Sequence, residues 1–429
     1  MGKIEIDHVL CYNSENLKKD LTMNKNAKES EKNNTACAKL KELLAKRTGT
    51  DSCDWHLTFR AREAMQVAFE DVRKIHGDGS VILQPFTCST VPEAVIASGM
   101  KLRYADINTE TLSIDRESLY SCHDAETDKN APAVLMQHTF GIIDDAKAAE
   151  MRCAADSAGL LLVEDCAHCA GRMAMGSDGQ PLADVSVHSF GVEKILPTQF
   201  GAAVWISPEM KDRKLYDAMT DHFRSLPATD ANASASVSTY ITRFRILSHL
   251  PAAVKDPLRR HWIRTHRFIP AVAAEELAGR TILEPSVPGD EVITPCLDAF
   301  RGIDDNESRR KAAVGSYRQA FTDVTSAFTV PASALKGDAQ PLLWFPLVCS
   351  CNEDAMKLHS ALNGAGIYNS TWGRPLLFPG VTDDEVFGFD DAVSTCPVCK
   401  ACSDGIVLLP TNKDPQQVSD IINIIKSSL

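Results

Sequence analysis

Between residues 60 and 206, apolar residues follow two patterns that alternate along the chain. Helical spacing occupies three segments, 65–72, 91–98 and 144–157, and the last two are followed by Gly99 and Gly159. Short apolar runs typical of buried strands lie at 81–83, 102–106, 133–137, 160–163 and 202–206. Because buried strands alternate with helices, the pattern predicts an α/β fold: a three-layer αβα large domain with a mostly parallel sheet.

The flanking segments have different patterns. Residues 1–35 are polar and rich in Asn, Lys and Glu, so we expect a flexible N-terminal extension followed by a helix over 38–47. Residues 301–429 predict a small C-terminal α+β domain, with helices at 306–321 and 415–425 and a strand at 342–348.

The large domain would then span residues 36–300. The structure of residues 210–290 is the hardest to predict. This segment contains a polar low-complexity patch at 228–237 and basic helices around 259–267. The pattern there predicts helices without indicating their purpose.

Composition excludes several classes of partner. The 429 residues carry a net charge of −12, which argues against nucleic acid as a partner. No apolar run is long enough to cross a bilayer, the start lacks a signal sequence, and Ile6 breaks the myristoylation pattern. The 14 cysteines are scattered, which favours free thiols in a reducing compartment. We therefore expect a cytoplasmic protein without a membrane partner.

Three polar residues near the ends of predicted strands are candidates for a functional site. Asp165 ends an apolar strand, and Ser189 and Lys194 follow near the end of a later one. Ligands in such folds bind at the carboxyl ends of the strands. A lysine amine can condense with the aldehyde of pyridoxal 5′-phosphate, a carboxylate can keep its ring nitrogen protonated, and a hydroxyl can hold its phosphate. A solvated surface lysine or aspartate is the simpler reading of each residue alone.

Longer motifs resemble the DegT/DnrJ/EryC/StrS sugar aminotransferases, which are fold-type-I pyridoxal-phosphate enzymes. The similarity runs in order from about residue 38 to 427 and lies in the order and spacing of the motifs. They are Pro85-Phe-Thr-Cys-Ser-Thr, Tyr104-Ala-Asp106-Ile-Asn, Gln137-His138-Thr-Phe-Gly141, Glu164-Asp165-Cys-Ala-His168, Ser189-Phe190 with Lys194, Gly366-Ile367 and Leu408-Leu-Pro410.

The resemblance implies a role for each matching residue. Lys194 would hold the cofactor and move protons, Asp165 would pair with the pyridinium, and Ser189 would contact the phosphate. His168 stands where the family usually has Gln near the ring hydroxyl. Ala61 and Arg62 would contact the phosphate at a helix N-terminus; the alternative is that Arg62 is a solvated first-turn residue.

The chain also departs from the family pattern. Cys88 replaces the aromatic residue that usually stacks on the ring, and His138 lies either beside the cofactor or in the packing. The glycine-rich segment after the lysine is shorter, at 195–201, and the Asn-Tyr-Arg motif lent across the family's dimer interface is not recognisable. These departures put a routine nucleotide-sugar specificity in doubt.

The implied function is transfer of an amino group from glutamate or glutamine to a keto group. The acceptor would be a nucleotide-linked sugar or a similar cyclic ketone. The partners would be the small-molecule keto substrate, the amino-acid donor and a second subunit in a homodimer. Two alternatives stay open. One is a degenerate, non-catalytic binding or regulatory subunit, and the other is a pyridoxamine-phosphate-dependent sugar dehydratase, although those relatives carry His where this chain has Lys194.

One further motif, a group of three cysteines, could bind a metal. Cys396, Cys399 and Cys402 are spaced as ligands of zinc or an iron–sulfur cluster would be, but the sequence offers no close fourth ligand. Thiols lining one face of a helix are the simpler interpretation, so we predict no metal.

Overall fold

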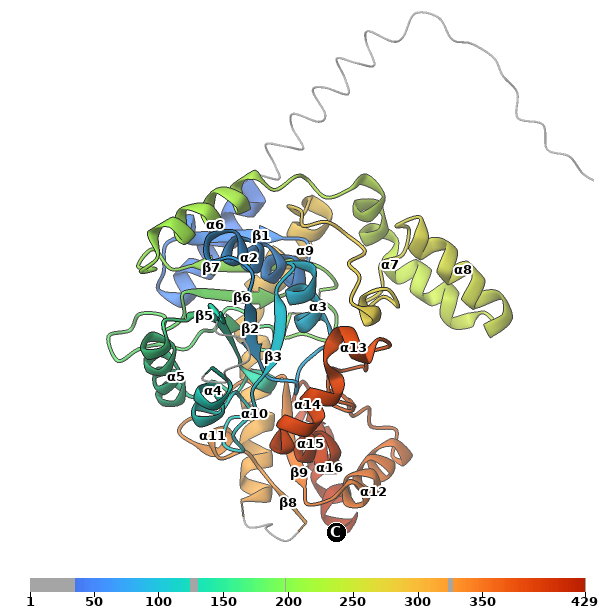
Figure 1. Ribbon diagram of the computed structural model, residues 1–429. Helices are drawn as coiled ribbons and strands as arrows, with labels where there is room; N and C mark the ends of the chain where they lie inside the picture. Colours follow the sequence, from blue (N-terminus) through green and yellow to red (C-terminus); the bar gives the residue numbers. More distant parts are fainter. Residues whose placement is uncertain (1–34, 124–129, 197, 323–326, 429) are drawn as a thin grey trace, which may run out of the picture.

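The computed structural model describes residues 35–123, 130–196, 198–322 and 327–428 (Figure 1). The predicted extension therefore lies outside the described residues except for its last position, where a helix over 35–48 begins. No helix of the described segments combines the length and the apolar character that crossing a bilayer requires.

From residue 61 to 165, strands and helices of the large domain alternate as the pattern predicted, whereas the last three strands follow one another along the described chain. The strands are β1 (Trp55–Thr58), β2 (Ser80–Leu83), β3 (Lys101–Tyr104), β4 (Ala133–Gln137), β5 (Leu161–Asp165), β6 (Val185–Ser189) and β7 (Ala202–Ile206). The helices are α2 (Ala61–His76), α3 (Thr90–Ala97), α4 (Arg116–His123), α5 (Asp145–Ala158), α6 (Arg213–Ser225), α7 (Ala231–His249), α8 (Ala252–Arg264) and α9 (Asp290–Arg301).

These strands form one seven-stranded sheet in the order β1-β7-β6-β5-β4-β2-β3. Strands β2 to β6 run parallel, whereas β7 is antiparallel to both β6 and β1. Apolar residues of α2, α3 and α6 pack on one face, and those of α4 and α5 pack on the other. The predicted αβα fold class with a mostly parallel sheet is therefore confirmed.

The C-terminal part has its own antiparallel sheet, in the order β10-β9-β8, and its own core. Its strands are β8 (Phe328–Thr329), β9 (Trp344–Cys349) and β10 (Ile406–Pro410). Its helices are α10 (Ile303–Phe321), α11 (Ala332–Leu335), α12 (Asn352–Gly364), α13 (Asp384–Phe387), α14 (Phe389–Thr395), α15 (Pro397–Gly405) and α16 (Pro415–Ser428). This is the small α+β unit that the sequence predicted.

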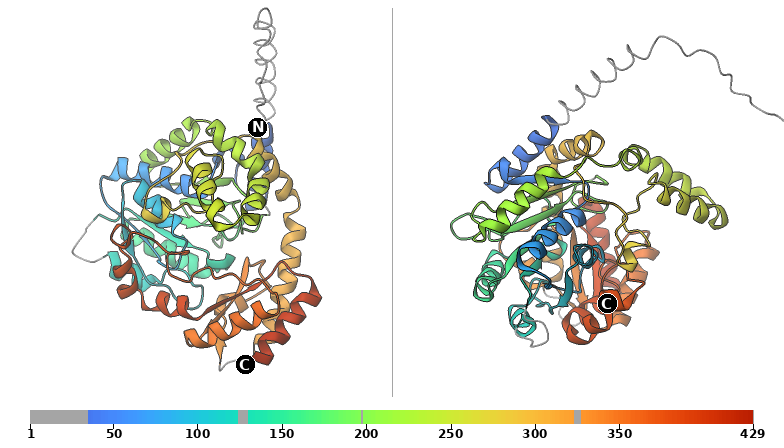
Figure 2. Two further views of the ribbon diagram at one scale, coloured as in Figure 1. Left: turned by 90° about the vertical axis from the view of Figure 1, so that its right-hand side faces the viewer. Right: turned by 45° about the horizontal axis from the view of Figure 1, so that its top comes forward.

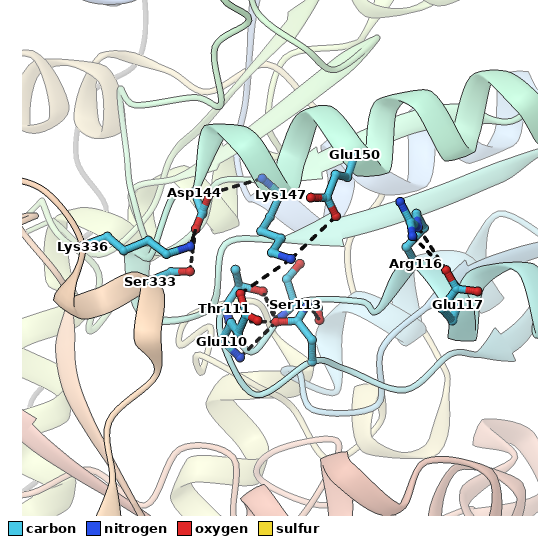
Figure 3. A network of polar contacts seen from close by, with 11 residues as sticks. Glu110, Thr111, Ser113, Arg116, Glu117, Asp144, Lys147, Glu150, Ser333 and Lys336 are labelled. Atoms are coloured by element: carbon cyan, nitrogen blue, oxygen red, sulfur yellow. Dashed lines mark hydrogen bonds and ion pairs between the residues drawn. The ribbon is translucent and has the colours of Figure 1, made fainter.

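A polar network ties this unit to the large domain (Figure 3). Asp144, the N-cap of α5, accepts hydrogen bonds from Ser333 Oγ at 2.6 Å and from Lys336 Nζ at 2.9 Å. Gln340 exchanges two hydrogen bonds with the backbone of Ile143, at 2.8 and 2.9 Å. The turn that follows β4 is therefore fixed from both units.

Candidate active site

The end of β5 carries two adjacent carboxylates that face opposite sides of the sheet. Glu164 points toward the α5 layer and Asp165 toward the α2 layer, because successive side chains of a strand alternate between its faces. Parallel pairing places Gln137 of β4 and Val187 of β6 beside Asp165. The carboxyl ends of three strands thus meet at this residue, at the edge of the sheet where such folds bind ligands.

Asp165 is buried but only partly satisfied. Its Oδ1 accepts a hydrogen bond from the Ala167 N–H at 2.8 Å, and within the described residues no hydrogen bond reaches Oδ2. Burial raises the pKa of this carboxyl, while the Ala167 N–H and the nearby Lys194 act to lower it. A buried carboxylate with one oxygen free is suited to pair with a cationic group of a ligand.

Lys194 lies on the loop that follows β6, directly after Glu193, whose φ of 62° is unusual for a residue with a side chain. Burial lowers the pKa of the Lys194 amine, while Cys88, Asp165 and Glu193 raise it and Arg62 lowers it. The structure thus brings Lys194 within electrostatic reach of three other predicted site residues, Cys88, Asp165 and Arg62. A lysine with a lowered pKa can act as a nucleophile or base near neutral pH.

His168 is buried in an aromatic cluster above this site. Its Nδ1 accepts the Phe140 N–H at 3.0 Å, so the neutral ring carries its proton on Nε2. Burial lowers the pKa of His168 well below its usual value, and the charge of Lys194 lowers it further. The ring can therefore donate one hydrogen bond to a ligand without carrying charge.

Three aromatic residues of this cluster were not predicted as part of the site. Trp372 of the small domain meets His168 at a ring distance of 4.8 Å and Phe140 at 5.2 Å, and Phe86 contacts Trp372 at 5.7 Å. The sequence signal for Phe86 and Phe140 was their place inside the quoted motifs. Trp372 gave only a faint signal, since it lies five residues beyond Gly366-Ile367.

His138 lies away from the candidate cofactor site. Its Nε2 is 2.5 Å from Glu164 Oε1, on the face of the sheet opposite to Asp165. Glu164 also accepts hydrogen bonds from the Ala174 N–H and the Ser186 hydroxyl. Burial alone would lower the pKa of His138, but the charge and hydrogen bond of Glu164 raise it to about 9. Of the two readings of His138, the geometry favours the hydrogen-bonded packing residue.

The start of α2 carries an ion-pair cluster. Arg60 Nη1 and Arg62 Nη1 lie 2.8 and 2.7 Å from the two oxygens of Glu276, and Arg60 also pairs with Glu63 at 2.9 Å. The Arg62 side chain is only 14% exposed, so the geometry favours a paired residue over a solvated first-turn residue. Ala61 is the first residue of α2, where the first amides have no partner within the helix.

Ser189 and Cys88 complete the predicted set. Ser189 ends β6 and accepts the Gly191 N–H at 3.3 Å, and α2 packs against this strand. Cys88 is half-buried, accepts the Thr90 hydroxyl at 3.2 Å and pairs through its backbone with Phe378 of the small domain. Cys88 therefore lies where the two structural units meet.

The cysteines at 396, 399 and 402 are buried in the core beside β3. The carboxylate of Asp106 accepts the N–H groups of Val398 and Cys399 at the start of α15, at 2.8 Å each. The motif therefore lies at the contact between α15 and the large domain, and Cys399 and Cys402 lie on α15 itself. All cysteines of the described residues are free thiols.

The donor set fits pyridoxal 5′-phosphate. It comprises a lysine amine, a buried carboxylate with one free oxygen, a neutral histidine donor, a serine hydroxyl and a helix N-terminus. The first three groups suit the aldehyde, the ring nitrogen and the ring hydroxyl of the cofactor, and the serine hydroxyl and the helix N-terminus both suit its phosphate.

Comparisons with known proteins agree with this geometry. The model of the DegT/DnrJ/EryC1/StrS aminotransferase family matches residues 35–242. No curated protein sequence matches this chain. Among solved structures, the sugar aminotransferase CalS13 from Micromonospora echinospora is 19% identical, with a TM-score of 0.62 and 92% of each chain covered.

Two other solved structures have similar scores. The Helicobacter pylori aminotransferase PseC, involved in the biosynthesis of pseudoaminic acid, is 15% identical with a TM-score of 0.62, covering 91% of this chain and 90% of its own. NtdA from Bacillus subtilis, solved with bound cofactor PMP, is 14% identical with a TM-score of 0.63, covering 92% and 77%. Residues 35–242 of this chain therefore match the DegT/DnrJ/EryC1/StrS aminotransferase family, and the described chain has the fold of solved sugar aminotransferases.

Proposed function

We propose that this protein transfers an amino group from glutamate or glutamine to a keto group. The acceptor is a nucleotide-linked sugar or a similar cyclic ketone. The observation that carries the proposal is that Lys194 and Asp165 are both buried and lie within electrostatic reach of each other. The lysine has a lowered pKa, and the buried carboxylate keeps Oδ2 free of hydrogen bonds from the described residues. The likeness to CalS13, a sugar aminotransferase, supports a sugar acceptor.

Each residue has a distinct task in this proposal. When bound, pyridoxal phosphate supplies an aldehyde for amine exchange and a ring that withdraws electrons. Lys194 Nζ would hold the cofactor through its aldehyde, and its amine, when free, would accept a proton from the donor's α-carbon. Asp165 would keep a proton on the ring nitrogen, and His168 would offer its Nε2–H to the ring hydroxyl.

The remaining assignments concern the phosphate and the partners. The Ser189 hydroxyl and the first amides of α2, at Ala61 and Arg62, would bind the phosphate. Arg62 would contribute through its backbone, because its guanidinium is already paired with Glu276. We also propose a cytoplasmic homodimer that contains two such sites.

A second candidate is a non-catalytic member that keeps the fold as a binding or regulatory subunit. One observation favours it: the carboxylate of Glu276 binds both arginine side chains at the start of α2, where the phosphate is expected. A carboxylate near that position would repel an anionic ligand unless the two arginines outweigh its charge.

The visible absorption spectrum of the purified protein separates the two candidates. We expect added pyridoxal phosphate to give a yellow band that shifts on addition of L-glutamate. Lys194→Ala should lack the band, whereas Lys357→Ala, which alters an exposed lysine on α12, should keep it. If the wild-type protein does not bind the cofactor, the proposed enzymatic function is overturned and the non-catalytic subunit is supported.

A further inference from the structure

Residues 372–379 of the small domain pack against the loop that follows β2. In Figures 1 and 2 the small domain, drawn in orange and red, lies against the large domain. Two backbone hydrogen bonds fix the contact, because the N–H groups of Leu377 and Phe378 donate to the carbonyls of Pro85 and Thr87, at 3.0 and 2.8 Å. The segment is therefore held in a defined register with the large domain.

Trp372 begins this segment, and its indole ring is closely fitted between side chains of the large domain. It meets Phe86 at a ring distance of 5.7 Å and Phe140 at 5.2 Å, both nearly edge to face. The next residue is Gly373, with a φ of 88°, where a Cβ would come within 2.6 Å of the Phe86 ring. Only glycine allows the backbone to approach that ring so closely. The position of the indole is therefore set by both structural units.

The indole also confines His168. The imidazole lies parallel to the Phe140 ring at 6.0 Å and meets Trp372 at 4.8 Å with an interplanar angle of 74°. Its Nδ1 accepts the Phe140 N–H. Among the described residues these two rings are the aromatic neighbours of His168, and only Trp372 belongs to the small domain. The orientation of the imidazole therefore depends on a residue from each unit.

This aromatic cluster borders on open space. Within the described residues no hydrogen bond reaches Trp372 Nε1 or His168 Nε2, and neither nitrogen is sealed from the surface, although the side chains are only 8% and 4% exposed. The core residue Trp205 differs, because its Nε1 is both unpartnered and sealed. A largely buried tryptophan usually pairs its N–H. Two accessible ring nitrogens without partners are typical of a surface that meets a ligand.

We propose that Trp372 is a positioning residue of the candidate site: from the small domain, it holds the His168 ring so that Nε2–H is available to the ring hydroxyl of pyridoxal phosphate. The inference rests on the proposed function, which assigns His168 to that hydroxyl. An imidazole already confined by two rings loses little further freedom when the cofactor binds, so binding costs less entropy. The docking of the small domain is thereby coupled to the cofactor affinity of the large domain.

A double-mutant cycle on the dissociation constant of pyridoxal phosphate tests the proposal, with the full-length protein and visible absorbance. Trp372→Leu keeps apolar bulk but loses the ring contact, and should raise the constant by about five- to tenfold, the scale of one aromatic pair. In His168→Ala protein the same change should raise it by about twofold or less, because the residue that Trp372 positions is gone.

Two further variants complete the cycle. Trp372→Phe retains an aromatic ring and should restore most of the affinity that Trp372→Leu loses. Trp262→Phe makes the same substitution on α8 and should leave the constant unchanged. If Trp372→Leu does not fold, Trp372→Met takes its place, because a long flexible thioether fills irregular gaps.

The pH titration of the yellow band separates positioning from packing. His168→Ala should shift the midpoint of that titration, because it removes a hydrogen-bond donor from the ring hydroxyl. Trp372→Leu should shift the midpoint in the same direction, whereas a loss of packing alone would lower stability and leave the midpoint in place.

Two outcomes would overturn the inference. One is an equal rise of the dissociation constant in the wild-type and His168→Ala backgrounds, and the other is a midpoint that Trp372→Leu does not move. Both leave the proposed function intact, since the wild-type protein still binds the cofactor and shows the band. A wild-type protein that does not bind pyridoxal phosphate would instead overturn the proposed function, and this inference with it.

Discussion

Glu164 and Asp165 are neighbours in sequence, yet they occupy opposite situations on the two faces of the sheet. Glu164 accepts hydrogen bonds from a backbone amide and a serine hydroxyl and pairs with His138, so its pKa is lowered despite burial. Asp165 accepts a single amide, and burial raises its pKa. The comparison teaches that burial alone does not mark a functional carboxylate; an incomplete set of partners does.

The strongest test of this comparison changes Asp165 to Asn. We expect turnover to fall by roughly 10²- to 10⁴-fold, the scale of losing one positioned ionisable group. The free energy of unfolding without cofactor should stay the same or rise, because the change removes a buried charge that lacks a close partner. Steady-state kinetics and urea unfolding measure the two quantities. A large loss of stability would mean that Asp165 is structural, as Glu164 is.

The complementary change is Glu164→Ala. It should lower the free energy of unfolding by about 3–5 kcal/mol, because it leaves the protonated His138 buried without its partner. Ser186→Ala is the matched control and should cost about 1 kcal/mol, since it removes only one hydrogen bond to the same carboxylate. Equal effects of the two variants would contradict the importance of the ion pair.

Most of the fold could be predicted from the sequence, but the different surroundings of Glu164 and Asp165 could be predicted only in part. Alternating apolar segments predicted the parallel sheet, because burial of β2, β4 and β5 leaves a clear pattern. The place of His138 opposite Glu164 depends on which faces two strands present after pairing, and spacing alone does not give that. Glu276 and Trp372 reach the site from segments more than 200 residues away from their partners Arg60 and His168, so local patterns could not connect them.

A third test uses pH. The pKa of His138 is raised to about 9 in the folded protein, against 6.5 for the ordinary side chain, so its contribution to stability is complete below about pH 6.5. It is lost as pH rises through about 9, with a slope of up to about 1.4 kcal/mol per pH unit for one proton. Glu164, with a lowered pKa, loses its contribution only in acid.

Urea unfolding at several values between pH 6.5 and 9.5 measures this loss. His138→Gln should remove this part of the pH dependence, and the difference between wild type and variant isolates it from other titrating groups. The same slope in both proteins would show that the histidine is not protonated in the folded state.

The smallest effect is expected from a hydrogen bond between the small domain and the loop that carries Lys194. The Tyr368 hydroxyl of the small domain donates to Glu193 Oε1 at 3.0 Å, and Glu193 raises the pKa of Lys194. Tyr368 is 59% exposed, so losing this hydrogen bond should cost at most about 1 kcal/mol. Tyr368→Phe should therefore lower kcat by about fivefold or less, with a shifted pH profile and unchanged stability. Tyr120→Phe, far from the site on α4, should alter neither. A loss of stability with normal turnover would mean that this contact only joins the two units, and that the site on the Asp165 face is held in place without it.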